Sequence, residues 1–332
     1  MIKNRSYIFL LLLFVFACQS NTNRLEVDVS DVADPNVKIK RYGEALFNID
    51  TTQLLPELKR LQPDFPVFLE GDLNNPVSLN RILNFVQDTL LISVYEDVEQ
   101  TYPDLDLFTS QLNDAVRHLK YYFPKAPDLN AYTYISGFDY EHPVQLYENN
   151  LLIALDMYLG GDYWRYKQLG IPLYILPRFS SDYLARDCMF EIASSMIHPN
   201  INQQDVLSQM IYQGKLLWFV KAMIPNLEDR VLLDYTPEGL AWAGKNEGLV
   251  WAFMIENQML YSAESTTVQK FIGEAPFTSF FGKDSPPRLG WFTGYRIVDA
   301  YMQKNSDISL GQLIREENAQ KILKASAYKP EL

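Results

Sequence analysis

The segments AYTYIS at residues 131–136 and NLLIALD at residues 150–156 differ in pattern from the rest of this chain. Both are short and rich in aliphatic, β-branched or aromatic side chains, and Gly137, Gly160 and Gly161 bound them. Short apolar runs between glycine-containing turns are typical of β-strands. The sequence therefore predicts two strands of a small sheet in the middle of the chain.

Helical periodicity dominates on both sides of this predicted sheet. In residues 37–47 apolar and polar residues alternate loosely, which predicts a further strand. Elsewhere apolar residues recur three and four positions apart, as in amphipathic helices. We expect helices at residues 54–61, 79–91, 105–122, 183–196, 204–223, 237–261, 265–272, 290–304 and 310–323, with N-caps at Asp205 and Thr236. The predicted fold class is therefore α+β and predominantly α-helical.

The N-terminus has the layout of a secretory signal. Lys3 and Arg5 precede an apolar run at residues 7–17, which is shorter than the roughly 20 residues of a permanent membrane-spanning helix. At its end, VFAC at residues 15–18 resembles the lipobox of bacterial lipoproteins, in which the cysteine receives a diacylglycerol and becomes the mature N-terminus. Phe16 departs from the smaller residue usual there. We predict lipidation at Cys18, with an ordinary signal peptide cut nearby as the alternative.

Cysteine usage and length define the expected domain plan. Cys18 and Cys188 are the two cysteines, so a lipid on Cys18 leaves Cys188 without a disulfide partner in the chain. About 300 residues after the signal are enough to bury a large core without a disulfide. We predict a signal peptide at residues 1–17, a lipidated N-terminus and flexible leash at 18–36, and one α-rich globular domain at 37–332.

The charge of the chain limits its partners. There are 29 Lys and Arg against 41 Asp and Glu, a formal net charge of −12, and no basic stripe is present in the sequence. Nucleic acids and anionic lipids both attract basic surfaces. The sequence therefore predicts no nucleic-acid partner, and a membrane tether that is covalent rather than electrostatic.

The segment CMFEIAS at residues 188–194 resembles a degenerate form of the active-site helix of zincin-type zinc metallopeptidases. That helix carries His-Glu-x-x-His and packs beneath a sheet edge; with Glu191 aligned on its glutamate, Phe190 and Ser194 occupy the two histidine positions. In one zincin branch the third ligand is a glutamate on the next helix, where Gln213 stands here. Phenylalanine, serine and a neutral amide are all unsuited to zinc. The resemblance implies a degenerate zincin-like domain, in which Glu191 is a weak catalytic candidate or an ordinary helix carboxylate.

The remaining residues give no stronger prediction of catalysis. His118, His142 and His198 are all the histidines in the chain, and no two of them have the spacing of metal ligands. A catalytic triad can assemble from distant residues, but the sequence has no Gly-x-Ser-x-Gly elbow. We therefore expect no bound metal, no cofactor and a pseudoenzyme rather than an enzyme.

The most specific sequence motifs lie in the C-terminal half: YQGKLLW (212–218), DYTPE (234–238), NEGLVW (246–251), SPPRLGW (285–291), GYRIV (294–298) and SAYKP (326–330). These segments resemble the GldB family of gliding-motility lipoproteins of Bacteroidetes, and the likeness covers most of the mature chain. The resemblance implies a membrane-anchored protein that supports gliding and is linked to the motility and protein-secretion machinery. It implies no known reaction.

These observations favour a non-catalytic binding or scaffolding lipoprotein of the cell envelope. The alternative is a hydrolase that acts on peptides or peptidoglycan through a modified zincin cleft, and a sugar-binding module is a weaker third. Glu247 and Arg296 stand among bulky apolar residues and are candidate cleft residues, or else solvated or internally paired charges. Surface-displayed lipoproteins of such bacteria tend to carry acidic residues after the cysteine. Residues 19–23 are uncharged, which favours a periplasm-facing location.

Overall fold

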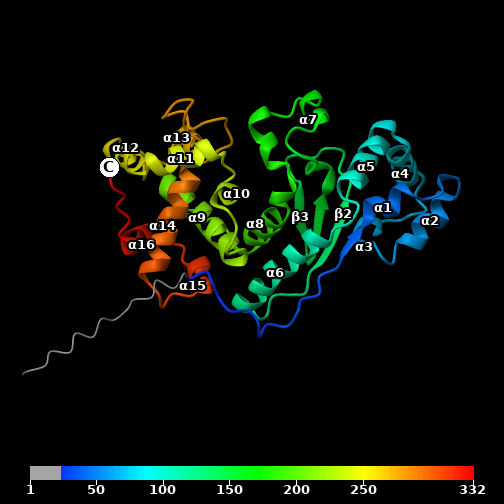
Figure 1. The fold of residues 1–332 in the computed structure, drawn as a ribbon, viewed down its shortest axis with the longest axis horizontal. Coiled ribbons are helices and arrows are strands. Elements are labelled where there is room, and N and C mark those ends of the chain that lie inside the picture. The colour runs from blue at the N-terminus through cyan, green and yellow to red at the C-terminus, as the bar shows by residue number, and fades with distance from the viewer. Residues whose placement is uncertain (1–23) are drawn as a thin grey trace, which may run out of the picture.

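A four-stranded mixed sheet lies within the N-terminal half of the molecule (Figure 1). The computed structural model describes residues 24–332. Three strands run parallel, and the fourth, β3, is an antiparallel edge strand beside β4. In the order of the sheet they are β1 (Ile39–Arg41), β2 (Asn130–Tyr134), β4 (Asn150–Ala154) and β3 (Val144–Tyr147). The two strands predicted in the middle of the chain are thus confirmed as β2 and β4.

The other two strands differ from the sequence-based expectation. The sequence pattern misses β3, because four residues are too few to show a clear alternation. The strand predicted at residues 37–47 is correct only for β1, since α1 (Tyr42–Phe47) follows it directly. Tyr42 and Leu46 are both buried, and their spacing of four residues places them on one side of a helix.

Helices from the first part of the chain cover the sheet. They are α1, α2 (Leu54–Leu61), α3 (Pro66–Leu69), α4 (Pro76–Gln87), α5 (Thr89–Thr101) and α6 (Asp106–Tyr122). The predictions of α2 and α6 are confirmed. The single helix predicted at residues 79–91 is wrong, because Asp88 ends α4 and caps α5 by accepting hydrogen bonds from the amides of Leu90 and Leu91.

The two faces of the sheet pack against different hydrophobic clusters. Tyr132 of β2 and Leu152 of β4 contact a small cluster formed with α1 to α4. Leu151 and Ile153 of β4 belong to the large cluster that contains the C-terminal helices. Because successive side chains of a strand point to opposite faces, the sheet joins the two clusters.

The C-terminal half is helical (Figure 1). Its elements are α7 (Trp164–Gln168), the 3₁₀ helix η3 (Leu173–Arg178), α8 (Leu184–Met196), α9 (Val206–Met223), α10 (Asp229–Leu233), α11 (Pro237–Lys245), α12 (Glu247–Glu256), α13 (Ser265–Ile272), α14 (Leu289–Lys304), α15 (Leu310–Arg315) and α16 (Ala319–Ser326). The N-caps predicted at Asp205 and Thr236 are confirmed.

Two helices predicted as continuous are each divided in two. The predicted helix at residues 237–261 breaks at Asn246, whose side-chain amide donates to the carbonyl of Trp242 at the end of α11. The predicted helix at 310–323 breaks before Asn318, whose side chain caps α16 by accepting from the amide of Lys321. In both places a local side-chain hydrogen bond competes with helix continuation.

Helices α9 and α14 are in backbone contact at the centre of this half. A Cβ atom on Gly214 would lie 2.3 Å from the carbonyl oxygen of Gly294, and one on Gly294 would lie 1.8 Å from that of Met210. Glycine, which has no Cβ atom, permits this approach. These two positions therefore fix how closely the two central helices pack.

Near its N-terminus the chain packs against the C-terminal half through Arg24 and Leu25. The Arg24 guanidinium donates to the carbonyl groups of Met302, Asn305 and Ile308, and Leu25 is buried in the large cluster. The predicted signal peptide and Cys18 lie outside the described residues. Within residues 24–332, no helix is long and apolar enough to span a membrane.

Candidate functional site

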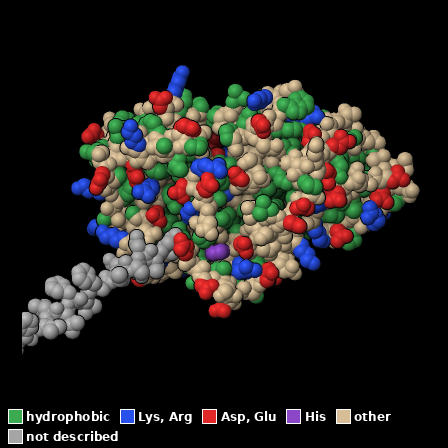
Figure 2. All heavy atoms as spheres, in the orientation of Figure 1, with side chains coloured by type: hydrophobic (Ala, Val, Ile, Leu, Met, Phe, Trp, Pro, Cys, Tyr) green, Lys and Arg blue, Asp and Glu red, His purple; other side chains and the backbone are tan. Residues whose placement is uncertain are grey.

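A cleft of about 530 Å³ opens between the sheet-containing half and the C-terminal helices. Its walls come from the loop before β3, from η3 and α8, and from the ends of α10, α13 and α14. Its charged lining residues are Glu141, Arg178, Arg186, Asp187, Glu191, Asp234, Glu274 and Arg288. Figure 2 shows acidic and basic side chains together over the middle of one face of the molecule. The cleft therefore combines charged groups of both signs with apolar and aromatic side chains.

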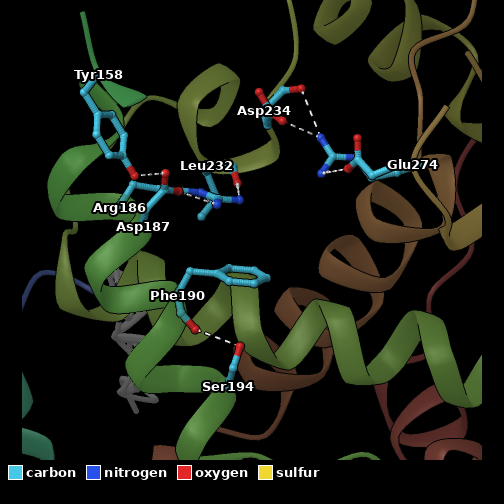
Figure 3. A network of polar contacts seen from close by, with 9 residues as sticks. Tyr158, Arg186, Asp187, Phe190, Ser194, Leu232, Asp234 and Glu274 are labelled. Carbon is cyan, nitrogen blue, oxygen red and sulfur yellow. Dashed lines mark hydrogen bonds and ion pairs between the residues drawn. The ribbon is translucent and has the colours of Figure 1, made fainter. Parts of the chain in front are cut away.

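Arg288, which directly precedes α14, links two segments of the cleft wall. Its Nη2 donates to Oδ2 of Asp234 at 2.7 Å, and its Nη1 lies 2.9 Å from Oε1 of Glu274 (Figure 3). Arg288 and Asp234 both adopt the left-handed backbone conformation, with φ of 50° and 54°. For residues other than glycine this conformation costs on the order of 1–3 kcal/mol. The ion pair holds both residues in this conformation and so helps to define the geometry of the wall.

Arg186 of α8 forms a second network on the opposite wall. Its Nη1 donates to Oδ1 of Asp187 at 2.8 Å and its Nη2 to the carbonyl of Leu232 at 3.1 Å, while Tyr158 donates to Oδ2 of Asp187 (Figure 3). The Nε atoms of Arg186 and Arg288 are buried and find no acceptor within residues 24–332. Each guanidinium group therefore has at least one buried N–H donor, at Nε, that no described acceptor satisfies.

Two aromatic rings join these walls. Phe190 of α8 and Trp291 of α14 stack with ring centres 5.6 Å apart and planes 5° from parallel. The Cζ atom of Arg186 lies 4.6 Å from the ring centre of Phe190, and that of Arg288 lies 4.6 Å from the ring centre of Trp291. Cation–π contacts of this kind are favourable when desolvated. The two buried arginines and the two rings thus form one packed unit across the cleft.

Glu191 also lines the cleft, next to Phe190 in the sequence. Burial raises the pKa of its carboxyl group, against the opposite effects of a hydrogen bond from the Leu146 amide and of His142. A carboxyl group with a raised pKa retains a proton to higher pH than an exposed one. This direction of shift makes Glu191 a candidate general acid or base in the cleft.

Two of the three residues aligned with zinc ligands, Phe190 and Ser194, make other contacts. Phe190 packs on Trp291, the Ser194 hydroxyl donates to the carbonyl of Phe190 at 2.9 Å, and Oε1 of Gln213 is buried without a hydrogen-bond partner among the described residues. Phe190 lines the cleft, whereas Ser194 and Gln213 do not. In the described part of the chain, no three His, Cys, Asp or Glu side chains are placed to hold a metal ion.

Glu247 and Arg296 pair with each other away from the cleft. Arg296 Nε donates to Oε1 of Glu247 at 2.9 Å, and the Tyr328 hydroxyl donates to the same oxygen at 2.8 Å. The Tyr328 ring stands edge-on to Trp251 at 5.1 Å. Neither charged residue lines the cleft. Their contacts join α12 and α14 to the C-terminal segment.

Most of the cleft residues could not be identified as site residues from the sequence. Arg186, Asp187 and Glu274 belong to no recognisable pattern. Asp234, Arg288 and Trp291 lie within the quoted segments DYTPE and SPPRLGW, but the pairing of Asp234 with Arg288 spans 54 residues. The family-like segments therefore mark Asp234, Arg288 and Trp291, but nothing in the sequence indicates that Asp234 and Arg288 form an ion pair.

Comparisons with known proteins agree with the segments quoted above. The family model described as gliding motility protein GldB matches residues 22–330. No curated protein and no solved structure matches the chain.

Proposed function

The chain belongs to the GldB family of gliding motility proteins, and from this premise we propose that it is a lipid-anchored, non-catalytic binding component of the gliding machinery. The family match supports a lipoprotein of the cell envelope with a role in gliding motility. In this proposal Cys18 carries the lipid, the folded part faces the periplasm, and the cleft binds a segment of a motility or secretion protein. The whole of residues 37–332 acts as one α-rich unit.

The composition of the cleft supports a polypeptide segment as the ligand. A volume of about 530 Å³ is within the range of specific binding pockets. Its lining combines carboxylates, arginines and exposed aromatic surface such as Tyr174, which suits the mixed side chains and backbone groups of a peptide. The observation that carries the proposal is the packed unit of Arg186, Phe190, Trp291 and Arg288, which gives the cleft a preorganised wall.

The side chains on α8 support binding without catalysis. The Phe190 ring is engaged by Arg186 and Trp291, and the Ser194 hydroxyl is used within its own helix. Neither side chain has a nitrogen that can hold zinc. This favours a pseudoenzyme, whatever the origin of the helix.

Photo-crosslinking in the native envelope tests the proposal. A photoreactive residue at Tyr174, which lines the cleft and is 40% exposed, should crosslink to one defined envelope protein. The matched control is Tyr121 on α6, which is 43% exposed and lies outside the cleft lining. Equal crosslinking at both positions, or none at Tyr174, would contradict a partner in the cleft.

The raised pKa of Glu191 favours one second candidate, a hydrolase that uses this carboxyl group as general base. Under that hypothesis, Glu191→Gln removes gliding while the protein remains folded and membrane-bound. Under the binding hypothesis the same substitution keeps gliding, because glutamine preserves the shape and polarity of the side chain. Gliding of the variant, compared at equal protein level, decides between the two.

A further inference from the structure

The structure shows where the tether meets the folded protein. Arg24 donates to the carbonyls of Met302, Asn305 and Ile308, at the end of α14 and in the turn before α15. The last carbonyls of a helix lack partners within it and carry partial negative charge. The described chain accordingly begins beside α15 (Figure 1). Arg24 thus attaches the N-terminal segment to this end of the molecule.

The short distance along the chain from Cys18 to Arg24 limits how the protein can face a membrane. Arg24 is the sixth residue after Cys18, and six extended residues reach at most about 21 Å. A lipid on Cys18, as proposed above, therefore keeps the ends of α14, α15 and α16 close to the bilayer. Helix α7 lies on the other side of the molecule (Figure 1).

The C-terminal segment that contains the partners of Arg24 differs in charge from the chain as a whole. We define the tether face as Arg24 together with residues 304–329. This 304–329 segment has five Lys and Arg against three Asp and Glu, a net charge of +2 in a chain of −12. An anionic bilayer attracts such a segment over a range of about one Debye length. This C-terminal segment of the sequence is therefore less acidic than the chain as a whole.

A depression of about 280 Å³ on the tether face offers a place for one phosphate group. Its lining residues are Tyr301, Ile308, Gln312, Arg315, Glu316 and Lys321. Ile308 also supplies a carbonyl to Arg24, so the depression adjoins the attachment point. Lys321 is paired with Glu316, whereas Arg315 is exposed and has no ion-pair partner in the part of the chain that the structure describes. Arginine is well suited to phosphate, because its planar donors can bind two oxygens at once.

We propose that the tether face rests on the membrane and that this depression binds the phosphate of an anionic phospholipid headgroup through Arg315, with Lys321 as a second contact. The proposal rests on the lipid anchor at Cys18, and it is independent of any partner in the cleft. The anchor places the protein at the bilayer, and the headgroup contact sets its orientation.

Site-specific labelling tests the orientation. The lipidated protein is reconstituted into vesicles that contain a lipid-borne quencher at the headgroup, with a fluorophore on a single introduced cysteine. Gln320→Cys on α16 and Gln168→Cys on α7 form a matched pair, since both glutamines are exposed. Cys188 is buried and remains unlabelled. We expect strong quenching at position 320 and little at 168; equal quenching, or stronger quenching at 168, would overturn the proposal.

The headgroup contact is tested on the same protein by varying the lipid. Phosphatidylglycerol added to phosphatidylcholine vesicles should increase quenching at position 320, and Arg315→Gln should weaken that response roughly fivefold, the effect of losing one cation at an anionic surface. Lys167→Gln on α7 is the control and should leave the response unchanged. An unchanged response in Arg315→Gln refutes the site, and abolition of the response by inorganic phosphate assigns the depression to free phosphate instead.

The outcomes separate this inference from the proposed function. Vesicles that fail to retain the wild-type protein refute the anchor, and the inference with it. Retained protein without a preferred orientation refutes the tether face alone. A missing crosslink at Tyr174 refutes the cleft partner and leaves the membrane experiments unaffected.

Discussion

Arg288 shows how unequally two carboxylates can contribute to one buried cation. The side chain of Arg288 is 4% exposed, that of Asp234 15% and that of Glu274 45%. Water screens the ion pair with the exposed Glu274 much more than the pair with Asp234. The two carboxylates therefore contribute unequally to the free energy of unfolding. The geometry of the cleft wall depends chiefly on Asp234.

The first prediction compares two isosteric substitutions. Asp234→Asn should lower the free energy of unfolding by about 3 kcal/mol, because it leaves a buried guanidinium without its closest counter-charge. Glu274→Gln should cost less than about 1 kcal/mol. Urea denaturation of both variants measures the difference, and similar losses would show that burial does not govern this site.

Glu191 gives a prediction about pH. Because burial raises its pKa in the folded state, folding favours the protonated form, and ionisation of Glu191 reduces stability as pH rises above the unfolded value. Glu191→Gln should therefore be more stable than the wild type at pH 7. The advantage should disappear at pH values below the unfolded pKa of about 4.3. Denaturation at both pH values checks this; an advantage that grows as pH falls would reverse the sign.

Cys188 gives a prediction about thiol chemistry. It is fully buried on α8, and burial raises the pKa of its thiol, with Asp187 and Glu191 adding to the effect. The reactive thiolate is therefore scarce. We expect no reaction with a thiol reagent in the native protein and complete reaction in denaturant. Rapid native labelling would show that this helix opens readily.

The residue scale also shows a limit of sequence reasoning. Residue type alone excludes Phe190 and Ser194 as zinc ligands, because neither side chain has the imidazole, thiolate or carboxylate group that binds zinc. The partnership of Arg288 with Asp234 is invisible in the sequence, because neither residue has a local pattern that specifies a partner 54 residues away. Likewise Glu247 and Arg296 look like candidate cleft charges until the structure places them against Tyr328.

At the scale of elements, the contact of α9 with α14 is the most sensitive to substitution. Gly294→Ala would place a methyl group 1.8 Å from the carbonyl oxygen of Met210, so the helices must separate, and we expect a loss of about 3 kcal/mol or more. Gly244→Ala on α11 is the control. Its added methyl group meets nothing within 4 Å, and the gain in helix propensity should stabilise the protein by up to about 1 kcal/mol. Thermal unfolding distinguishes the two, and a mild effect at Gly294 would contradict the backbone contact.

Elements with a strong helical period are predicted well from the sequence, whereas their interruptions are not. Helices α2, α6, α9 and α13 lie where the spacing of apolar residues places them. The breaks at Asp88 and Asn246 are missed, because the apolar spacing continues across both positions while local side-chain hydrogen bonds, which cap the start of α5 at Asp88 and close the end of α11 at Asn246, interrupt the helix. Strand β3 is missed because of its length.

At the scale of the whole molecule, the anchor should matter more than any single cleft residue. Under the proposed function, Cys18→Ala would remove the lipid and with it the fixed position of the cleft at the membrane, so we expect loss of gliding. Glu191→Gln should leave gliding intact, because glutamine preserves the shape and polarity of the side chain. Gliding of the two strains at equal protein level measures the ranking; a Cys18→Ala strain that glides normally would contradict it.

Helix α14 runs between the cleft and the place where Arg24 is bound, the two sites on which the proposals depend. Its N-terminal end contributes Arg288 and Trp291 to the cleft, and its C-terminal end receives Arg24, the first described residue after the tether. The helix has 16 residues and is about 24 Å long. A partner that moves while held in the cleft would therefore put the protein under tension along this helix. Because α9 packs against its backbone, α14 is supported along this path, and under the proposed lipid anchor a pull at the cleft would be carried toward the Arg24 end of the helix.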